Sequence, residues 1–202
     1  MVDDPSVMDG RSARALRTRQ SIVDALLALI ESGELKPPAP RIAERAGVSL
    51  RSIYQHFDDL EALFAAAAER YRDHVVALVD VLPSDGPLEA RLDAFVEQRA
   101  RILEAITPVR RASLLQEPFS EQLRASRDAT LAVARKEVAH VFDQELSTLP
   151  AEERDDALTA LDIASAWSTW DALRLAGHDP SRAAAIMRSM LHALVRSLVP
   201  VA

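Results

Sequence analysis

The sequence predicts an all-α protein of about nine helices, and three observations favour this class. Hydrophobic residues make up 49% of the 202 residues but aromatic residues only 4%, a composition typical of packed helices. Apolar residues recur at helical spacing, as at Ile22, Leu26, Leu29 and Ile30. No segment alternates apolar and polar residues as a half-buried strand does.

Caps and chain breaks divide the sequence into these helices. Gly33 ends the first helix, Asp58 or Asp59 begins the fourth, and Ser181 begins the last. Pro108 ends another helix, because proline lacks the N–H that an interior helical position needs. The predicted helices span about residues 12–32, 40–46, 49–57, 59–82, 88–106, 108–116, 119–147, 155–176 and 181–198.

The composition excludes several classes of function. The chain has no cysteine, which excludes disulfides, thiolate metal sites and cysteine nucleophiles. The five histidines are scattered without metal-ligand spacing, and the chain has no glycine-rich phosphate loop, zinc-protease motif or nucleophile elbow. The acidic, polar start does not match a signal peptide, and no apolar run is long enough for a membrane helix. We therefore expect a soluble, cytoplasmic protein that is not an enzyme and has no metal, cofactor or membrane partner.

The charge is distributed unevenly along the chain. The formal net charge of −7 by itself argues against binding to nucleic acid. Residues 11–57, however, hold eight basic and four acidic side chains, whereas residues 58–202 hold 16 basic and 24 acidic ones. A basic N-terminal head can attract phosphate locally even when the rest of the chain is acidic.

The stretch IAERAGVSLRSIYQHF, residues 42–57, is the most informative part of the sequence. It predicts two short helices joined by a tight turn, in which Gly47 can take the left-handed conformation and Ser49 can cap the second helix. Ile53 and Phe57 lie one turn apart and face inward, which leaves polar side chains on the outer face. Such a helix suits the major groove of DNA.

With these residues in view, the chain resembles the TetR (tetracycline-repressor) family of transcriptional regulators. The resemblance rests on residues 17–29, on IAERAGVS at 42–49, on IYQHF at 53–57 and on LEALF at 60–64. It implies a three-helix DNA-binding head (residues 11–58), a linking fourth helix (59–82) and a C-terminal ligand-binding and dimerisation domain (83–202). The partners it implies are a double-stranded DNA operator, a small-molecule effector and a second copy of the chain.

Two positions depart from the family pattern. Pro38 stands where the family commonly has Thr or Ser before the second helix, and Leu60 stands where it often has a phosphate-binding Lys. Both changes remove contacts to the DNA backbone that the resemblance would otherwise imply. We therefore expect the arginines of the head to carry more of the backbone binding; they are Arg17, Arg19, Arg41 and Arg51.

Each polar residue near the predicted second helix of the motif has two interpretations. Arg51 can read guanine or contact phosphate, and Gln55 can read adenine or stay a hydrated surface amide. Tyr54 and His56 resemble backbone contacts of the family, but they can instead pack on the first helix or bond between helices. Ser49 can cap alone or also reach a phosphate. The full set of predicted DNA contacts is Arg17, Arg19, Arg41, Ser49, Leu50, Arg51, Ser52, Tyr54, Gln55 and His56.

The predicted ligand site in the C-terminal part depends on weaker patterns. Trp167 and Trp170, one helical turn apart, predict either a pocket wall or a pair in the core or dimer interface. Arg110 and Arg111 can neutralise an anionic ligand or lie solvated on the surface. The candidate ligand-binding residues are Arg110, Leu114, Trp167 and Trp170.

The apolar residues of the last two predicted helices exceed what one packed layer needs, which predicts a homodimer with a four-helix interface. They are Leu158, Leu161, Ala164, Leu173, Met187, Met190, Leu191, Leu194 and Val195. The function expected from these features is a ligand-responsive repressor that binds a near-palindromic operator as a homodimer. The alternative is a helical ligand-binding or interaction protein with a weak or vestigial DNA-binding head.

Overall fold

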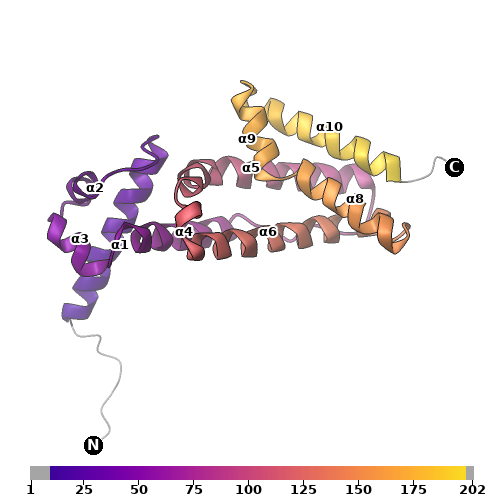
Figure 1. Ribbon diagram of the computed structural model, residues 1–202. Helices are drawn as coiled ribbons and strands as arrows, with labels where there is room; N and C mark the ends of the chain where they lie inside the picture. Colours follow the sequence, from indigo (N-terminus) through magenta and orange to yellow (C-terminus); the bar gives the residue numbers. More distant parts are fainter. Residues whose placement is uncertain (1–9, 199–202) are drawn as a thin grey trace, which may run out of the picture. The chain divides into compact units, whose positions relative to one another are not determined.

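The computed structural model describes residues 10–198 and shows an all-α fold, with no strand in this range (Figure 1). The predicted fold class is therefore confirmed. No helix within these residues is both long and apolar enough to span a bilayer. The helices are α1 (Gly10–Glu31), α2 (Ala39–Ala46), α3 (Leu50–His56), α4 (Leu60–Val76), α5 (Leu88–Leu114), the 3-10 turn η1 (Glu117–Phe119), α6 (Glu121–Val141), α7 (Asp143–Leu146), α8 (Ala151–Ala164), α9 (Trp167–Leu175) and α10 (Pro180–Leu198).

The described chain divides into two compact units. The head unit comprises residues up to Asp73 together with Pro108–Arg124, and the body unit comprises His74–Thr107 and the residues from Ala125 onward. Helices α4, α5 and α6 each contribute residues to both units. The functional division into residues 11–58, 59–82 and 83–202 remains a prediction.

The head unit has an apolar core beneath α1, α2 and α3. Ile22, Leu26 and Ile30 of α1 are buried against Ile42 of α2 and Ile53 of α3. The core also includes Leu63, Phe64, Ala66 and Ala67 of α4 and two α5 residues, Val109 and Ala112. No charged side chain of α1, α2 or α3 among the described residues is buried. The core of these three helices therefore uses the apolar positions that the helical periodicity of the sequence picks out.

In the body unit, α10 lies beside α8 and α9 (Figure 1). Five of the nine apolar residues that predicted the dimer interface are buried inside this unit, and they are Leu161, Ala164, Met187, Leu191 and Val195. The prediction that these five form surplus apolar surface is wrong, because α8 and α10 bury them against each other and against α5, α6 and α7. Met190 has 38% of its surface exposed.

Buried charge joins α5 to α6 and α7. Arg91 is only 1% exposed and pairs with Glu145, with a nitrogen–oxygen distance of 2.5 Å. It also donates to the carbonyls of Gly86 and Val141. Arg99, stacked 4.7 Å over the Phe95 ring, pairs with Glu137 at 2.7 Å. Burial lowers the pKa of Arg99, and the negative charge of Glu137 partly offsets that effect.

Helix α5 does not end before Pro108 as the sequence predicts but continues through it to Leu114. Proline removes one backbone hydrogen bond, but it does not force a helix to end where both flanks are held by packing. Leu103 on one side and Val109 and Ala112 on the other are buried. The Thr107 hydroxyl in addition donates to the Leu103 carbonyl at 2.7 Å.

The predicted fourth helix is too long, because α4 ends at Val76 and not near Leu82. The backbone beyond it finds partners elsewhere in the body unit. The Asp80 N–H donates to the Gln98 side chain at 2.6 Å, and the His140 ring lies 3.1 Å from the Leu82 carbonyl oxygen. Side chains distant in sequence thus replace the helical hydrogen bonds.

Further helix boundaries differ from the prediction, among them the start of α8, which lies at Ala151 and not near Asp155. The predicted helix over 119–147 breaks at Phe142, between α6 and α7, and the one over 155–176 breaks at Ser165 and Ala166, between α8 and α9. The last helix begins one residue before Ser181, and Asp179 caps it by accepting the Arg182 N–H at 2.8 Å.

Candidate nucleic-acid interface

The turn between α2 and α3 has the predicted geometry. Gly47 has a φ of 67°, the left-handed region in which glycine costs least, and ends α2. The Val48 N–H donates to the Ala43 carbonyl at 3.0 Å. Ser49 caps α3, because its hydroxyl oxygen accepts the Ser52 N–H at 3.1 Å. These local bonds fix the path of the chain from one helix into the next.

The inner face of α3 is anchored in the head core. Ile53 is completely buried, and Phe57, directly after the helix, is almost completely buried. Across the interface, Ala43 of α2 is buried as well, so a larger side chain at this position would push the helices apart. The Ser21 hydroxyl of α1 donates to the Ala46 carbonyl at the end of α2, at 3.4 Å. The predicted structural roles of these residues agree with this packing.

The outer face of α3 is polar and accessible. Arg51 and Gln55 are exposed, and Tyr54 has 52% of its surface exposed, so its ring is not packed in the core. Ser52 and His56 are half-buried, and Leu50 is exposed at the start of the helix. The Arg51 side chain makes no hydrogen bond or ion pair with any residue in the range 10–198. The structure thus brings the predicted α3 contacts together on one short helix.

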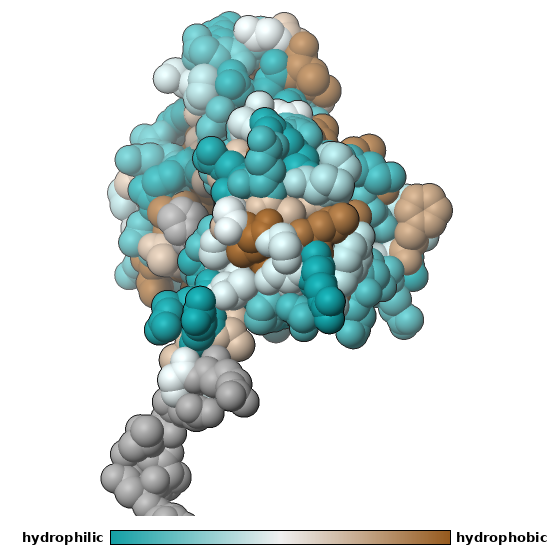
Figure 2. Space-filling view, turned by 90° about the vertical axis from the view of Figure 1, so that its left-hand side faces the viewer, coloured by the Kyte–Doolittle hydropathy of each residue, from teal (hydrophilic) through white to brown (hydrophobic). Residues whose placement is uncertain are grey.

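The side of the molecule on which α2 and α3 lie in Figure 1 is mostly hydrophilic, with a short hydrophobic band across it (Figure 2). A hydrophilic surface with some apolar contact area suits a groove lined by phosphates, base edges and thymine methyl groups.

The predicted arginines outside α3 differ in their availability. Arg17 is exposed. Arg19 is exposed, with its guanidinium 4.6 Å over the Phe57 ring, which orients it. Arg41 pairs with Glu44 at 2.8 Å and with Glu34 at 3.6 Å, and the hydrogen bond to Glu44 raises its pKa. Arg41 must leave these carboxylates before it can contact a phosphate.

Two features lie beside the motif, and only the second of them, the aspartate cap of α4, was predicted from the sequence. Arg45 is an exposed cation in the last turn of α2, two residues before Gly47. Asp59 accepts the Ala62 N–H at 2.8 Å and so caps α4, with Asp58 exposed beside it. These carboxylates occupy the helix terminus that would otherwise favour a phosphate. Arg45 could have been found from its position next to the glycine turn.

The predicted ligand-binding residues lie in two different units. Arg110, which is paired with Glu117, and exposed Leu114 belong to the head unit. Trp167 and Trp170 belong to the body unit. Trp170 is completely buried and donates its indole N–H to Glu104 at 3.0 Å, while the Trp167 indole donates to the Thr107 hydroxyl at 3.1 Å. Of the two interpretations of Trp170, its burial favours the core.

The sequence of the motif matches a known family model, described as bacterial regulatory proteins of the tetR family, over residues 22–67. Residues 22–67 are thus similar to the N-terminal segment of the tetR family of bacterial regulatory proteins. The matched segment runs from α1 through the recognition helix α3 into α4. The head is thus that of a DNA-binding transcriptional regulator.

Solved structures of similar fold extend the likeness over most of the chain. A tetR-family transcriptional regulator from Streptomyces coelicolor aligns with a TM-score of 0.67 and 21% identity, covering 90% of this chain and 88% of that one. A transcriptional regulator from Rhodococcus sp. Rha1 aligns with a TM-score of 0.65 and 21% identity, covering 91% and 96%. The multidrug binding protein EbrR, complexed with imidazole, aligns with a TM-score of 0.59 and 22% identity, covering 100% and 99%. Comparison with curated proteins gives no match.

Proposed function

We propose that this protein is a cytoplasmic, homodimeric repressor of the TetR family that binds a near-palindromic operator and responds to a small-molecule effector. The observation that carries the proposal is the accessible polar face of α3 on a completely buried apolar base. Two such helices, one from each subunit, would enter neighbouring major-groove segments about one helical turn or a multiple apart.

Base recognition would come from α3. Arg51 can donate two hydrogen bonds to guanine and Gln55 can pair with adenine, each worth about 1–3 kcal/mol of discrimination. Tyr54, Ser49 and the exposed arginines Arg17 and Arg45 would contact the sugar-phosphate backbone. The carboxylates of Asp58 and Asp59 would weaken backbone binding next to α4, so that the arginines supply most of it.

Dimerisation would use the outward faces of the last helices. Leu158, Leu173 and Leu194 remain partly buried, and Met190 is exposed on α10. Exposed Ile163 on α8 and small exposed residues on α10, namely Ser189 and Ala193, would allow close approach of a second copy. Size-exclusion chromatography with light scattering at micromolar concentration tests this, and a monomer of 22.2 kDa would overturn it.

An effector would act by changing the separation of the two α3 helices in the dimer. Once one head is bound, the second binds as an intramolecular event, so operator affinity depends on the separation of the two recognition helices. A ligand that binds the conformation with the wrong separation more tightly lowers operator affinity by its ratio of affinities for the two states. The multidrug binding protein EbrR, solved with imidazole, supports a small-molecule role for a chain of this fold.

The test is binding to DNA fragments from beside the protein's own gene, measured by fluorescence anisotropy at several salt concentrations. We expect one fragment to bind specifically, with affinity that falls steeply with salt. Arg51→Ala should lower specific affinity by about tenfold or more, while Arg182→Ala, an exposed arginine of the body unit, should leave it unchanged. Equal affinity of Arg51→Ala and wild type for the specific fragment would contradict the assignment of α3.

The rival function is a helical ligand-binding or interaction protein with a weak or vestigial head. The ion pairs that hold Arg41 and the aspartates at α4 are the observations that favour it. Absence of specific binding to any fragment of its own genome, together with retained ligand binding, would establish the rival over the repressor.

A further inference from the structure

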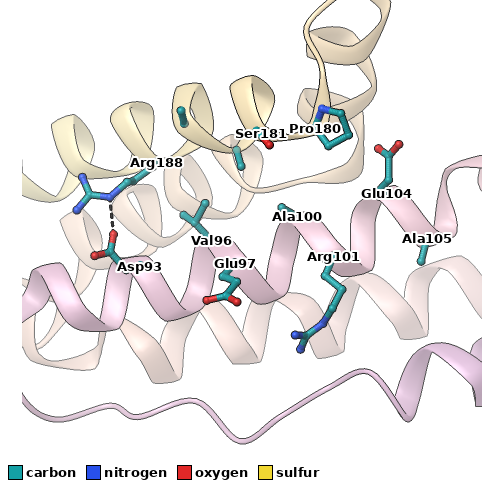
Figure 3. A pocket seen from close by; sticks show the side chains of 12 residues that line it. Asp93, Val96, Glu97, Ala100, Arg101, Glu104, Ala105, Pro180, Ser181 and Arg188 are labelled. Atoms are coloured by element: carbon teal, nitrogen blue, oxygen red, sulfur yellow. Dashed lines mark hydrogen bonds and ion pairs between the residues drawn. The ribbon is translucent and has the colours of Figure 1, made fainter.

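A groove of about 740 Å³ lies within the body unit, between α5 and α10. Six of its twelve lining residues are apolar, and they include Val96 and Ala100 of α5, which Figure 3 labels, and Ala184 of α10. Because these side chains are short, the two helices leave a hollow large enough for a drug-sized molecule. None of the four residues predicted from the sequence as ligand contacts lines it.

The cations at the groove are already engaged. Arg188 pairs with Asp93 at 2.5 Å, as Figure 3 shows, and with Glu89 at 2.6 Å. Arg101 pairs with Asp80 at 2.8 Å and donates to the Leu78 carbonyl at 3.1 Å. An anionic ligand would have to displace these carboxylates, so the groove does not favour one.

Glu97, by contrast, has no ion-pair partner among residues 10–198 and lines the groove with its carboxylate exposed. A second lining carboxylate, Glu104, is 41% exposed and shares its charge with Arg174 at 3.1 Å. Including the pairing partners Asp80, Glu89 and Arg174, five carboxylates face three guanidinium groups around the groove. The excess is negative, while the floor is apolar.

We propose that this groove binds lipophilic organic cations, with the apolar body against Val96, Ala100 and Ala184 and the positive charge beside Glu97 and Glu104. An apolar cation matches both the floor and the uncompensated carboxylate, whereas a neutral ligand would gain no Coulomb attraction to Glu97. The proposal names a ligand class and a site for the effector, and it rests on the proposed function for its regulatory meaning but not for binding itself.

The structure also provides the reporter. The chain has two tryptophans, and the indole of one of them, Trp170, donates directly to the Glu104 carboxylate at 3.0 Å. A bound cation that pairs with Glu104 weakens this hydrogen bond and the ion pair between Glu104 and Arg174. We therefore expect tryptophan fluorescence to change on binding. No label is required.

The test uses the full chain and two probes of the same shape and opposite charge, tetraphenylphosphonium and tetraphenylborate. Titration calorimetry and tryptophan fluorescence should both show saturable binding of tetraphenylphosphonium that weakens with added salt. Tetraphenylborate should bind at least about tenfold more weakly at the site that Ala100→Phe blocks, since that site offers no free cation. Equal affinities for the two probes at that site would overturn the proposal.

Variants separate the groove from the rest of the surface. Glu97→Gln should weaken tetraphenylphosphonium binding about two- to fivefold, and Glu97→Asp should retain most of it. Ala100→Phe should fill the hollow and abolish binding. Glu153→Gln, which removes an exposed carboxylate of the same unit that does not line the groove, should have no effect. Unchanged binding in both Glu97→Gln and Ala100→Phe would overturn the proposal.

Operator binding, measured separately, distinguishes this proposal from the repressor function. If the cation binds and Ala100→Phe prevents it, but operator affinity does not change, the groove stands and its role as the effector site fails. If the cation releases the wild-type protein from DNA, but the Ala100→Phe variant still binds the cation, then the groove is not the cation site, although the repressor function stands.

Discussion

The helix-turn-helix segment is held by apolar packing, whereas buried ion pairs contribute to the interface between α5, α6 and α7. In the first, Ile42, Ile53 and Phe57 pack on apolar residues of α1, and charge stays on the surface. In the second, the buried pair Arg91–Glu145 and the nearly buried pair Arg99–Glu137 join the helices. Removing apolar atoms from a core lowers the unfolding free energy by an amount that depends on the cavity left behind. A buried charge that loses its partner lowers it strongly, because the remaining charge is neither paired nor hydrated.

The sharpest test of this comparison is Glu145→Ala, which leaves Arg91 buried without its carboxylate. We expect the free energy of unfolding to fall by about 3–5 kcal/mol, measured by urea denaturation. The double variant Arg91→Met/Glu145→Leu, which removes both charges at similar volume, should stay much closer to wild type. If the double variant is as unstable as the single one, the pair is not what makes this interface fragile.

In the head, Ile53→Ala should cost about 2–5 kcal/mol of unfolding free energy, because it leaves a cavity under the recognition helix. Its neighbour Tyr54, half exposed on the same helix, gives the matched control. Tyr54→Ala should cost less than about 1 kcal/mol while still weakening DNA binding. Similar losses of stability in the two variants would contradict the division of α3 into a buried and a DNA-facing side.

A smaller effect is expected at the turn. Gly47→Ala should destabilise the head by about 1 kcal/mol, because alanine is strained at a φ of 67° although no atom lies within 4 Å of its added Cβ. Gly47→Asn should cost less, since asparagine tolerates this conformation. Thermal unfolding of the two variants measures the difference, and equal losses would point to packing and not to backbone strain.

The smallest effect concerns the exposed ion pairs of the body. Hydrogen bonds from Arg188, aided by His192, lower the pKa of Glu89. A carboxylate whose pKa is lower in the folded state stabilises the fold above its unfolded pKa and loses that contribution as pH falls through the folded one. We expect Glu89→Gln to reduce the unfolding temperature slightly at pH 7, and the reduction to shrink as the pH falls below about 4.3, the ordinary pKa of a glutamate. A difference that persists unchanged at acid pH would assign the effect to something other than charge.

The sequence predicted the head closely because every feature there is local. The glycine turn, the Ser49 cap and the inward spacing of Ile53 and Phe57 each depend on residues within a few positions of one another. The predicted DNA contacts on α3 were likewise placed on one helix. What escaped prediction was the state of Arg41, because its pairing with Glu34 depends on how the chain before α2 is placed.

The body was predicted less well because its boundaries depend on distant partners. α4 ends at Val76, and beyond it the Asp80 N–H bonds to Gln98, 18 residues away. α5 continues through Pro108 because residues on both flanks are buried. The apolar residues of α8 and α10 predicted surface for a partner, but most of them fill the unit's own core.

By itself the sequence determined the all-α class, the helix-turn-helix and its exposed polar face, since helical periodicity, caps and one glycine act over a single turn or two. Only the tertiary structure decided which charged side chains form ion pairs within the molecule and which remain free to bind a partner. Arg91 and Glu145 are 54 residues apart, and Glu97 has no ion-pair partner in the described part of the chain, beside a groove formed by helices distant in the sequence. Pairing energy depends on distance and burial in space, and these are fixed only when the helices pack.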